Sequence, residues 1–285
     1  MSDASKLSNG IFHKYRKIIG QTLNADKFDI KLVNISTSNL TFALQTKDKV
    51  YYAKVFANER GDLSVKGKNH LLDTNNRFFM EWMILVSKQY FGLCPHLVLA
   101  LPKPRIIITD QVEGQGYLSI ADTTLEPTYL EGIGAWLHTF HSKQPVKQVE
   151  TNVLESLFSK SEAISLLSAK EQKKYADQTI SSFVFSKSDT QVGNFKLAEF
   201  GVVGLDFELC GYRPRFYDFI GVADSVLSVS KINCSEVVGH LLKGYASHKE
   251  ELEESLIIDL VNVFSEYRKK KETKGNARFS LKNPV

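Results

Sequence analysis

Cysteine is scarce in this sequence, and its scarcity excludes two classes of protein. The three cysteines, Cys94, Cys210 and Cys234, lie far apart, and no Cys-x-x-Cys pair indicates a zinc site or a redox centre. An odd number of cysteines fits a reducing compartment better than a disulfide framework. His138 and His141 stand at helical spacing, but no third metal ligand accompanies them, so we predict that they are packing residues.

Long apolar runs and a strong charge bias are missing as well. No apolar run approaches the roughly 20 residues that span a bilayer, and the N-terminal residues MSDASKLSNG lack the apolar core of a signal peptide. The 36 basic and 32 acidic residues leave a formal charge of +4, which is too small an excess to indicate nucleic-acid binding. We therefore expect a soluble, cytoplasmic protein that neither spans a membrane nor binds nucleic acid.

The secondary-structure pattern changes along the chain. Five segments of the first part are rich in β-branched and aromatic residues, as is typical of strands: 28–35, 40–46, 50–57, 96–101 and 105–112. Residues 76–91 between them carry the apolar stripe of a helix. The remainder is mainly helical. We predict an α+β fold with two lobes: a small antiparallel β lobe with one embedded helix at 1–113, and a larger, mainly helical lobe at 114–285, with a ligand cleft between them.

Three polar residues flank a predicted hairpin in the stretch SKSDTQVGNFKLAEFGVVGLDFEL. Asp189 is followed by Asn194, and a short apolar strand then ends at Asp206. Turn chemistry explains each residue singly, because Asp and Asn are favoured in turns, but it does not explain their common spacing around one hairpin. Phosphoryl transfer needs a carboxylate that orients the attacking hydroxyl and an Asn and an Asp that hold Mg²⁺. The spacing therefore favours a phosphoryl-transfer site.

A lysine and a glutamate in the first part of the chain fit the same chemistry. Lys54 lies on a predicted strand, and Glu81 interrupts the apolar stripe of the helix that follows. Each has an ordinary alternative, as a solvent-facing strand lysine or as a carboxylate on a helix surface. Together they match the strand lysine and helix glutamate that hold nucleotide phosphates in kinases.

The motifs DTQVGN and GLDFELCGYRPRFYDF resemble those of the aminoglycoside phosphotransferase and choline kinase families, which have a protein kinase-like fold. The resemblance extends in order over most of the chain, although only these two motifs are specific. It implies an ATP- and Mg²⁺-dependent kinase that phosphorylates a hydroxyl group of a small molecule. An amino alcohol, a sugar or an aminoglycoside would be such a substrate, and the substrate could be cationic.

The resemblance also implies roles for single residues of the larger lobe. Asp189 would be the catalytic base or the carboxylate that orients the hydroxyl, while Asn194 and Asp206 would hold Mg²⁺. Glu208 would assist the metal or the substrate, and Asp218 would brace the loop without taking part in the chemistry.

In the smaller lobe the resemblance implies a nucleotide site. Lys54 would contact the α- and β-phosphates and pair with Glu81. The remaining nucleotide contacts would come from the phosphate loop at Ser36, Thr37, Ser38 and Asn39, and from the backbone of Asp110, Gln111 and Val112, which would receive the adenine.

One departure from the family pattern leaves two interpretations open. Lys187 and Ser188 stand where the families have His followed by Gly or Asn. The histidine supports the loop by packing and hydrogen bonding, so a lysine threatens the geometry more than the chemistry, or adds a cation near the transferred phosphate. The chain is then either an active small-molecule kinase or a catalytically impaired, pseudokinase-like module that binds a nucleotide or a partner.

Overall fold

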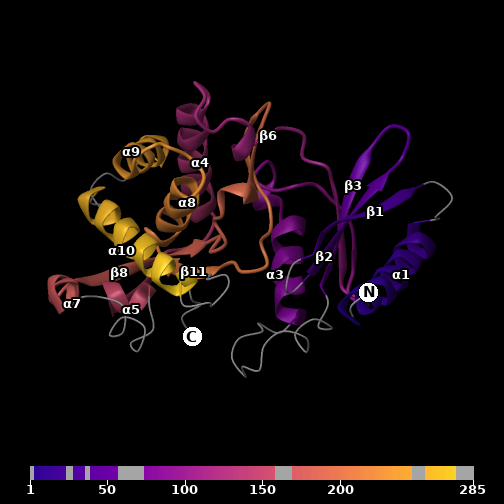
Figure 1. Cartoon of the computed structure of the whole chain (residues 1–285), viewed down its shortest axis with the longest axis horizontal. Coiled ribbons are helices and arrows are strands. Elements are labelled where there is room, and N and C mark those ends of the chain that lie inside the picture. Colours follow the sequence, from indigo (N-terminus) through magenta and orange to yellow (C-terminus); the bar gives the residue numbers. More distant parts are fainter. Residues whose placement is uncertain are drawn as a thin grey trace. The chain divides into compact units, whose positions relative to one another are not determined.

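The chain folds into two compact units, which we call the small and the large unit (Figure 1). The computed structural model describes residues 3–23, 28–35, 39–56, 74–157, 169–245 and 254–273. The small unit comprises Met1–Phe91 and Pro95–Val112, and the large unit comprises Gly92–Cys94 and Glu113–Val285.

A five-stranded antiparallel sheet forms the centre of the small unit. Its strands, in spatial order, are β1 (Asp29–Ile35), β2 (Asn39–Gln45), β3 (Val50–Phe56), β5 (Ile106–Asp110) and β4 (Leu97–Leu101). Successive side chains of a strand point to opposite faces of its sheet. In β3 this alternation sends Ala53 and Val55 into an apolar core on one face, and Lys54 and Phe56 to the other face.

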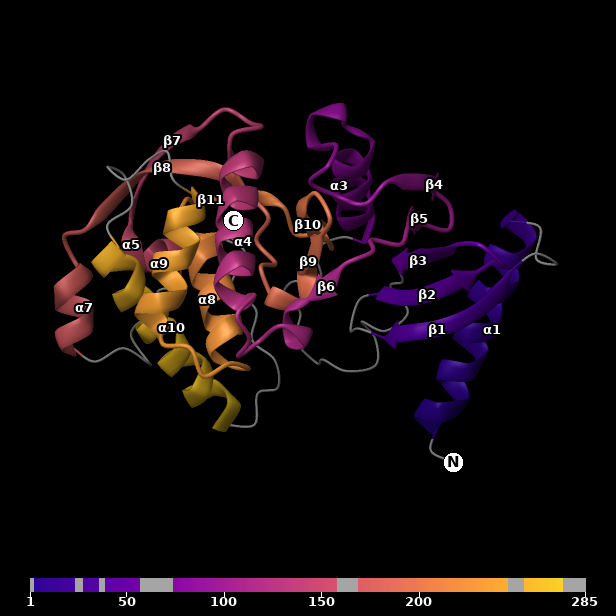
Figure 2. The same ribbon diagram turned by 90° about the horizontal axis from the view of Figure 1, so that it is seen from above.

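Two helices flank this sheet. Helix α1 (Asp3–Leu23) runs beside β1 (Figure 2) and contributes Tyr15 and Ile19 to the apolar core formed with the sheet. Helix α3 (Thr74–Val86) packs by Phe78 against Phe56, with ring centroids 5.7 Å apart. A short 3₁₀ turn, η3 (Lys88–Tyr90), follows it. The packing of α3 against Phe56 therefore holds this helix on the face of β3 that carries Lys54.

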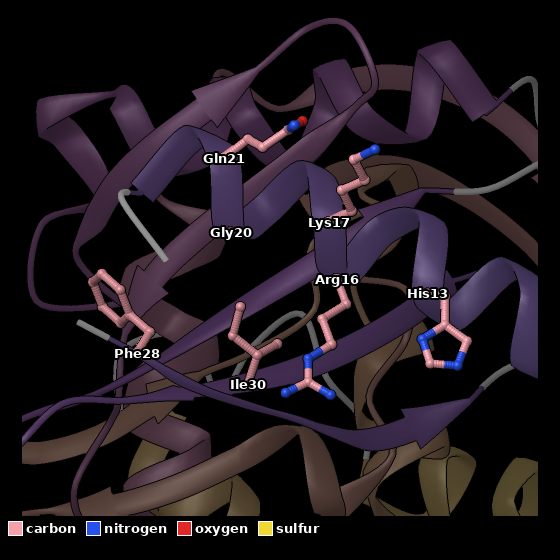
Figure 3. A pocket seen from close by; sticks show the side chains of 7 residues that line it. All are labelled: His13, Arg16, Lys17, Gly20, Gln21, Phe28 and Ile30. Atoms are coloured by element: carbon pink, nitrogen blue, oxygen red, sulfur yellow. The ribbon is translucent and has the colours of Figure 1, made fainter. Parts of the chain in front are cut away.

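A hollow of about 590 Å³ lies beside α1 in the small unit (Figure 3). Its lining residues come from α1, from β1 and from the residue before β1: His13, Arg16, Lys17, Gly20, Gln21, Phe28 and Ile30. Lys54, Glu81 and the other predicted nucleotide-binding residues that the structure describes are not among them. The hollow is therefore separate from the predicted nucleotide site.

The large unit combines helices with two three-stranded antiparallel sheets. Its longer helices are α4 (Glu126–His141), α8 (Tyr217–Leu227), α9 (Cys234–Tyr245) and α10 (Glu254–Thr273), and its shorter ones are α5 (Val153–Leu157), α7 (Ala169–Tyr175), η4 (Tyr117–Ser119) and η5 (Val192–Asn194). One sheet has the order β10 (Gly201–Gly204), β9 (Phe195–Ala198) and β6 (Gln115–Gly116). The other has the order β11 (Gly211–Pro214), β8 (Thr179–Ser186) and β7 (Lys147–Asn152).

Helices α4 and α9 approach each other unusually closely. A Cβ atom added at Gly134 of α4 would fall on the carbonyl oxygen of Leu241, and one added at Gly244 of α9 would fall on the carbonyl oxygen of Glu131. Glycine is required at both positions because the backbones occupy the space that a side chain would need. This close packing fixes the ends of α4 and α9, which carry His141 and Tyr245.

Strands β7 and β11 and the two-residue strand β6 were not predicted from the sequence. Residues of β7 are mostly polar and exposed, so no alternation of apolar side chains marks the strand. Strand β11 contains Gly211 and Pro214, which are depleted in strands and are tolerated at a sheet edge, and it lies at the edge of its sheet. Between β7 and β8, where the sequence predicts mainly helix, α5 and α7 lie within the described residues. No described helix has both the length and the apolar character that crossing a bilayer requires.

Candidate active site

The three polar residues around the predicted hairpin are brought together in the large unit. Strand β8, which is buried from Phe183 onward, ends at Ser186, and the segment after it leads through Asp189 to η5, which ends at Asn194. The hairpin β9–β10 then returns the chain, and the amide of Leu205 donates to the carbonyl of Asn194 at 2.8 Å. The side-chain amide of Asn194 also lies 3.4 Å from the carbonyl of Asp189. Asp206 therefore comes directly after Leu205, whose amide is bonded to Asn194.

Lys187 lies inside this arrangement and not on its surface. Its side chain is fully buried, and its ammonium group donates to the carbonyl of Asp206 at 2.8 Å and to the carbonyl of Asp189. The ammonium nitrogen lies 5.6 Å from the ring centroid of Phe195 and 5.5 Å from that of Phe207. The lysine therefore supports the loop from within, and its donors are directed to the backbone.

Asp218 of α8 holds the start of the same loop from the other side. One carboxylate oxygen accepts from the hydroxyl of Ser186 at 2.8 Å and the amide of Ser188 at 3.0 Å. The other accepts from the amide of Lys187 at 3.1 Å and from Nε2 of His141 at 2.8 Å. Burial alone would raise the pKa of this fully buried carboxyl, but the hydrogen bonds outweigh it and hold the pKa below its usual range.

His141 is a supporting residue that the sequence analysis assigned to packing alone. An ionised carboxylate can only accept, so Nε2 of His141 carries the proton donated to Asp218. Nδ1 of the same ring is hydrogen-bonded to the hydroxyl of Tyr245, 3.0 Å away. Both residues are buried. The signal was a polar residue on the apolar face of a helix, since a buried imidazole needs a partner, but the sequence does not tell which partner.

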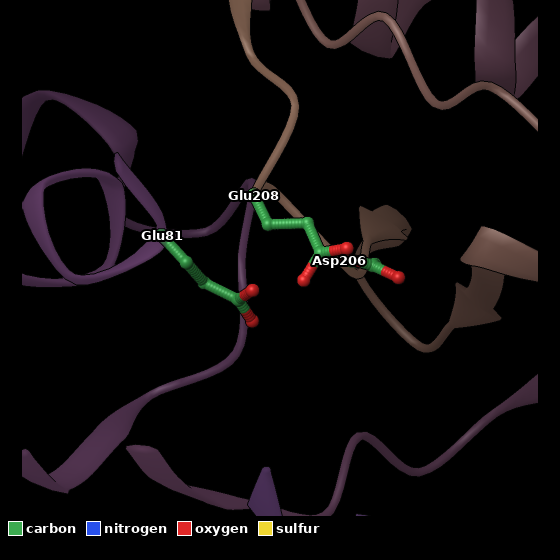
Figure 4. Close-up of side chains that lie close together, drawn as sticks. All are labelled: Glu81, Asp206 and Glu208. Carbon is green, nitrogen blue, oxygen red and sulfur yellow. The ribbon is translucent and has the colours of Figure 1, made fainter. Parts of the chain in front are cut away.

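Three acidic side chains gather at this loop. Burial raises the pKa of Asp189, and the carboxylates of Asp206 and Glu208 raise it further, while Lys187 opposes the shift. A carboxylate oxygen of Asp206 lies within 4.8 Å of one of Glu208 (Figure 4). Carboxylates and an asparagine amide oxygen are the ligands that Mg²⁺ prefers in proteins. The residues present therefore fit a divalent cation, whose charge would offset the repulsion among the carboxylates.

In the small unit, Lys54 and Glu81 form an ion pair. The ammonium nitrogen of Lys54 on β3 lies 2.6 Å from Oε2 of Glu81 on α3, and the two side chains are 13% and 8% exposed. The pair explains the charge within the apolar stripe of α3, because a buried carboxylate requires a partner. It also places the lysine ammonium at a defined position on the sheet.

The other predicted nucleotide contacts are only partly described. Asn39 is buried at the start of β2, while Ser36, Thr37 and Ser38 lie outside the described residues. Asp110 ends β5, and its carboxylate lies 3.1 Å from Nδ1 of His96. The amide of Gln111 is bonded to the carbonyl of Val50 at 3.1 Å, and Val112 ends the small unit.

Comparison with solved structures identifies the fold. The chain matches the choline kinase LicA from Streptococcus pneumoniae with a TM-score of 0.58 and 15% identity, over 93% of this chain and 94% of that one. It matches the amicoumacin kinase hAmiN with a TM-score of 0.57 and 17% identity, over 95% and 90% of the two chains. An aminoglycoside-3'-phosphotransferase of type VIII gives 0.55 and 13%, over 85% and 94%.

The chain has the protein kinase-like fold of choline kinases and aminoglycoside phosphotransferases. The predicted α+β fold class is confirmed. No protein-family model matches the chain, and no curated protein matches its sequence. The likeness to these kinases is therefore a likeness of three-dimensional structure. In the sequence it was limited to two short motifs.

Two non-glycine residues of the candidate site have left-handed backbone. Ser188 has φ 67° and Asp206 has φ 63°, a conformation that costs a residue with a side chain about 1–2 kcal/mol. Both conformations are stabilised by hydrogen bonds of the backbone. The amide of Ser188 is bonded to Asp218, and the carbonyl of Asp206 is bonded to Lys187. The hydrogen bonds of the loop therefore sustain local strain.

Ser188→Gly should stabilise the protein by about 0.5–1 kcal/mol, because glycine adopts positive φ without the steric cost of a Cβ atom. The backbone donor to Asp218 is retained in this variant. The free energy of unfolding from urea titration measures the effect. Ser181→Gly, at an exposed position of β8, is the control and should destabilise by a similar amount. Loss of stability in Ser188→Gly as large as in the control would contradict the strain argument.

Proposed function

We propose that this protein transfers the γ-phosphate of ATP to a hydroxyl group of a small molecule in the presence of Mg²⁺. The observation that carries the proposal is the gathering of Asp189, Asn194 and Asp206 around one hairpin, held by Lys187 and Asp218. Structures of the same fold support it: hAmiN was solved with AMP-PNP and Ca²⁺, and LicA with AMP. Small-molecule kinases are thus the class whose chemistry these residues suit.

Asp189 is assigned to the acceptor hydroxyl. A carboxylate that accepts a proton works best when its pKa lies nearer the working pH, and burial moves the pKa of Asp189 in that direction. Asn194 and Asp206 are assigned to Mg²⁺, with Glu208 beside them. Bound Mg²⁺ supplies positive charge to the transferred phosphoryl group. The protein's own contribution is to fix the positions of these oxygens.

The nucleotide is assigned to the small unit. Lys54, held by Glu81, would contact the α- and β-phosphates, and the backbone at Asp110, Gln111 and Val112 would receive the adenine. Asn39, with the neighbouring Ser36, Thr37 and Ser38, would contact the phosphates. The ion pair supports this assignment because it holds the ammonium group in place before the nucleotide arrives, which lowers the entropic cost of binding.

Glu81→Gln should weaken ATP binding about tenfold, since the hydrogen bond between charged groups that positions Lys54 is lost. Titration with a fluorescent ATP analogue measures the dissociation constant in the presence of Mg²⁺. Asp29→Asn is the control, because Asp29 pairs with Lys31 on the exposed surface of the same unit. This substitution should leave the dissociation constant unchanged. Equal affinity in Glu81→Gln and the wild type would refute the role of the pair.

An ATP-consumption screen tests the proposed function itself. The purified protein is offered amino alcohols, sugars and aminoglycosides, with and without Mg²⁺, and ADP and phosphorylated product are both measured. We expect Mg²⁺-dependent product with one of these classes. Mg²⁺-dependent ATP binding without product across the whole panel would instead support a catalytically impaired module.

That alternative interpretation rested on Lys187 and Ser188. The structure weakens the case for it, because buried Lys187 bonds the segments of Asp189 and Asp206 together, and Ser188 is held by Asp218. These contacts support the proposed transfer, because they hold together the residues to which it is assigned.

A further inference from the structure

The ammonium group of Lys187 joins two parts of the chain that are separated by the whole β9–β10 hairpin. It donates to the carbonyl of Asp189, two residues along, and to the carbonyl of Asp206, 19 residues along. The first residue carries the proposed proton acceptor and the second a proposed metal ligand. A single side chain thus bonds to the peptides that carry two different functions.

Lysine can bond to the carbonyls of both Asp189 and Asp206, whereas the histidine of the resembled motif could bond to one of them. A lysine ammonium has three N–H donors, whereas a neutral imidazole has one donor and one acceptor. A histidine at position 187 could therefore donate to one of the two carbonyls. Lysine donates to both, and the departure from the motif adds a bond to the loop.

The surroundings of Lys187 retain the ammonium in this place. Two aromatic rings flank it, at 5.6 and 5.5 Å, within the range of favourable cation–π contacts. The ring of Phe195 belongs to the residue after Asn194, and the ring of Phe207 to the residue after Asp206. Since each ring is adjacent in sequence to a proposed metal ligand, the contacts with Lys187 orient both backbone segments.

We propose that Lys187 is a positioning residue that sets the backbone of Asp189 and Asp206 in one fixed geometry, so that the proton acceptor and the metal site are aligned by a single buried cation. This inference rests on the proposed function for the roles of the two aspartates. The bonds that Lys187 makes, however, can be tested without any turnover.

The test compares Lys187→Met and Lys187→His with the wild type. Methionine keeps the length and loses the donors, and histidine restores the residue of the family motif with one donor. Lys243→Met is the control, because Lys243 on α9 makes an exposed ion pair with Glu131 at 2.7 Å. Hydrogen exchange of the metal-free full-length protein reports on residues 187–190 and 205–208, and Mn²⁺ titration reports on the metal site.

In Lys187→Met, exchange should become about tenfold faster in both segments, and the dissociation constant for Mn²⁺ should rise about tenfold, as expected when hydrogen bonds to a charged group are lost. Lys187→His should fall between methionine and the wild type in both measurements. Lys243→Met should change neither of them.

Three outcomes would overturn the inference. Unchanged exchange in either segment of Lys187→Met would show that the lysine does not link the two. Faster exchange with unchanged Mn²⁺ affinity would reduce its role to stability, and a wild type that binds no Mn²⁺ would remove the metal site. If Lys187→Met does not fold, Lys187→His decides by the same criteria. A wild type that binds Mn²⁺ but turns over no ATP would defeat the proposed function alone.

Discussion

Asp189→Asn should lower the rate of the proposed phosphoryl transfer by about 10²–10⁴-fold, the range that a positioned general base contributes, and should leave ATP affinity unchanged. An amide has nearly the shape of the carboxylate but cannot accept the proton of the acceptor hydroxyl. The main-chain carbonyl bonded to Lys187 is kept, so the loop retains its support. The expected signature is therefore a lower kcat at an unaltered nucleotide dissociation constant.

The measurement is steady-state transfer to whichever acceptor the screen identifies, with ATP binding titrated separately. Asp177→Asn is the matched control, since Asp177 is exposed in the same unit, and it should turn over like the wild type. If Asp189→Asn kept the parental rate, Asp189 would not be the residue that serves the hydroxyl. If it lost ATP binding together with transfer, the defect would lie in the fold and the assignment would gain no support.

Much of the fold follows from patterns that are local in the sequence. In strand β2, the buried apolar residues Leu40, Phe42 and Leu44 alternate with more exposed ones because one face packs on the core, and this alternation is visible in the residues themselves. Strand β7 shows no such pattern, since its side chains are mostly exposed. It exists because its backbone pairs with β8, from Lys147 opposite Phe183 to Asn152 opposite Thr179. Such pairing depends on distant residues, which a local pattern does not report.

The candidate site divides in the same way. The spacing of Asp189, Asn194 and Asp206 around one hairpin is a short-range property, so the sequence was sufficient to predict that they meet. Lys187 stood out only as a departure from a motif, and its effect could not be inferred. A buried ammonium group stabilises a loop only if acceptors and aromatic rings surround it. The folded hairpin brings these groups to Lys187, among them the carbonyl of Asp206.

The hydrogen bonds that hold Asp218 also depend on residues far apart in the sequence. His141 at the end of α4 bonds to Asp218 of α8 and to Tyr245 at the end of α9. Three helices therefore determine the position of one carboxylate, which in turn holds the backbone of Lys187 and Ser188. The distance between α4 and α9 is then a requirement of the site as well as of the core.

Gly244→Ala should cost about 3 kcal/mol of unfolding free energy or more, at the upper end of the range for overpacked cores. The added methyl group would fall on the carbonyl oxygen of Glu131. Because that oxygen belongs to the backbone of α4, no side-chain rotation can relieve the clash, and the helices must separate. Separation would also draw Tyr245 away from His141, so we expect the variant to lose activity even below its melting temperature.

Gly239→Ala on the same helix is the matched control. A Cβ atom there meets its nearest neighbour, an oxygen of Glu254, at an ordinary 3.9 Å. The substitution should stabilise the protein by about 1 kcal/mol, because alanine favours the helix more than glycine does. Urea denaturation of both variants measures the change in unfolding free energy. We expect this change to have opposite signs at the two positions, although both substitutions are Gly→Ala. If Gly244→Ala were as stable as Gly239→Ala, the two helices would not be in backbone contact, and the support that they give to Asp218 would require another explanation.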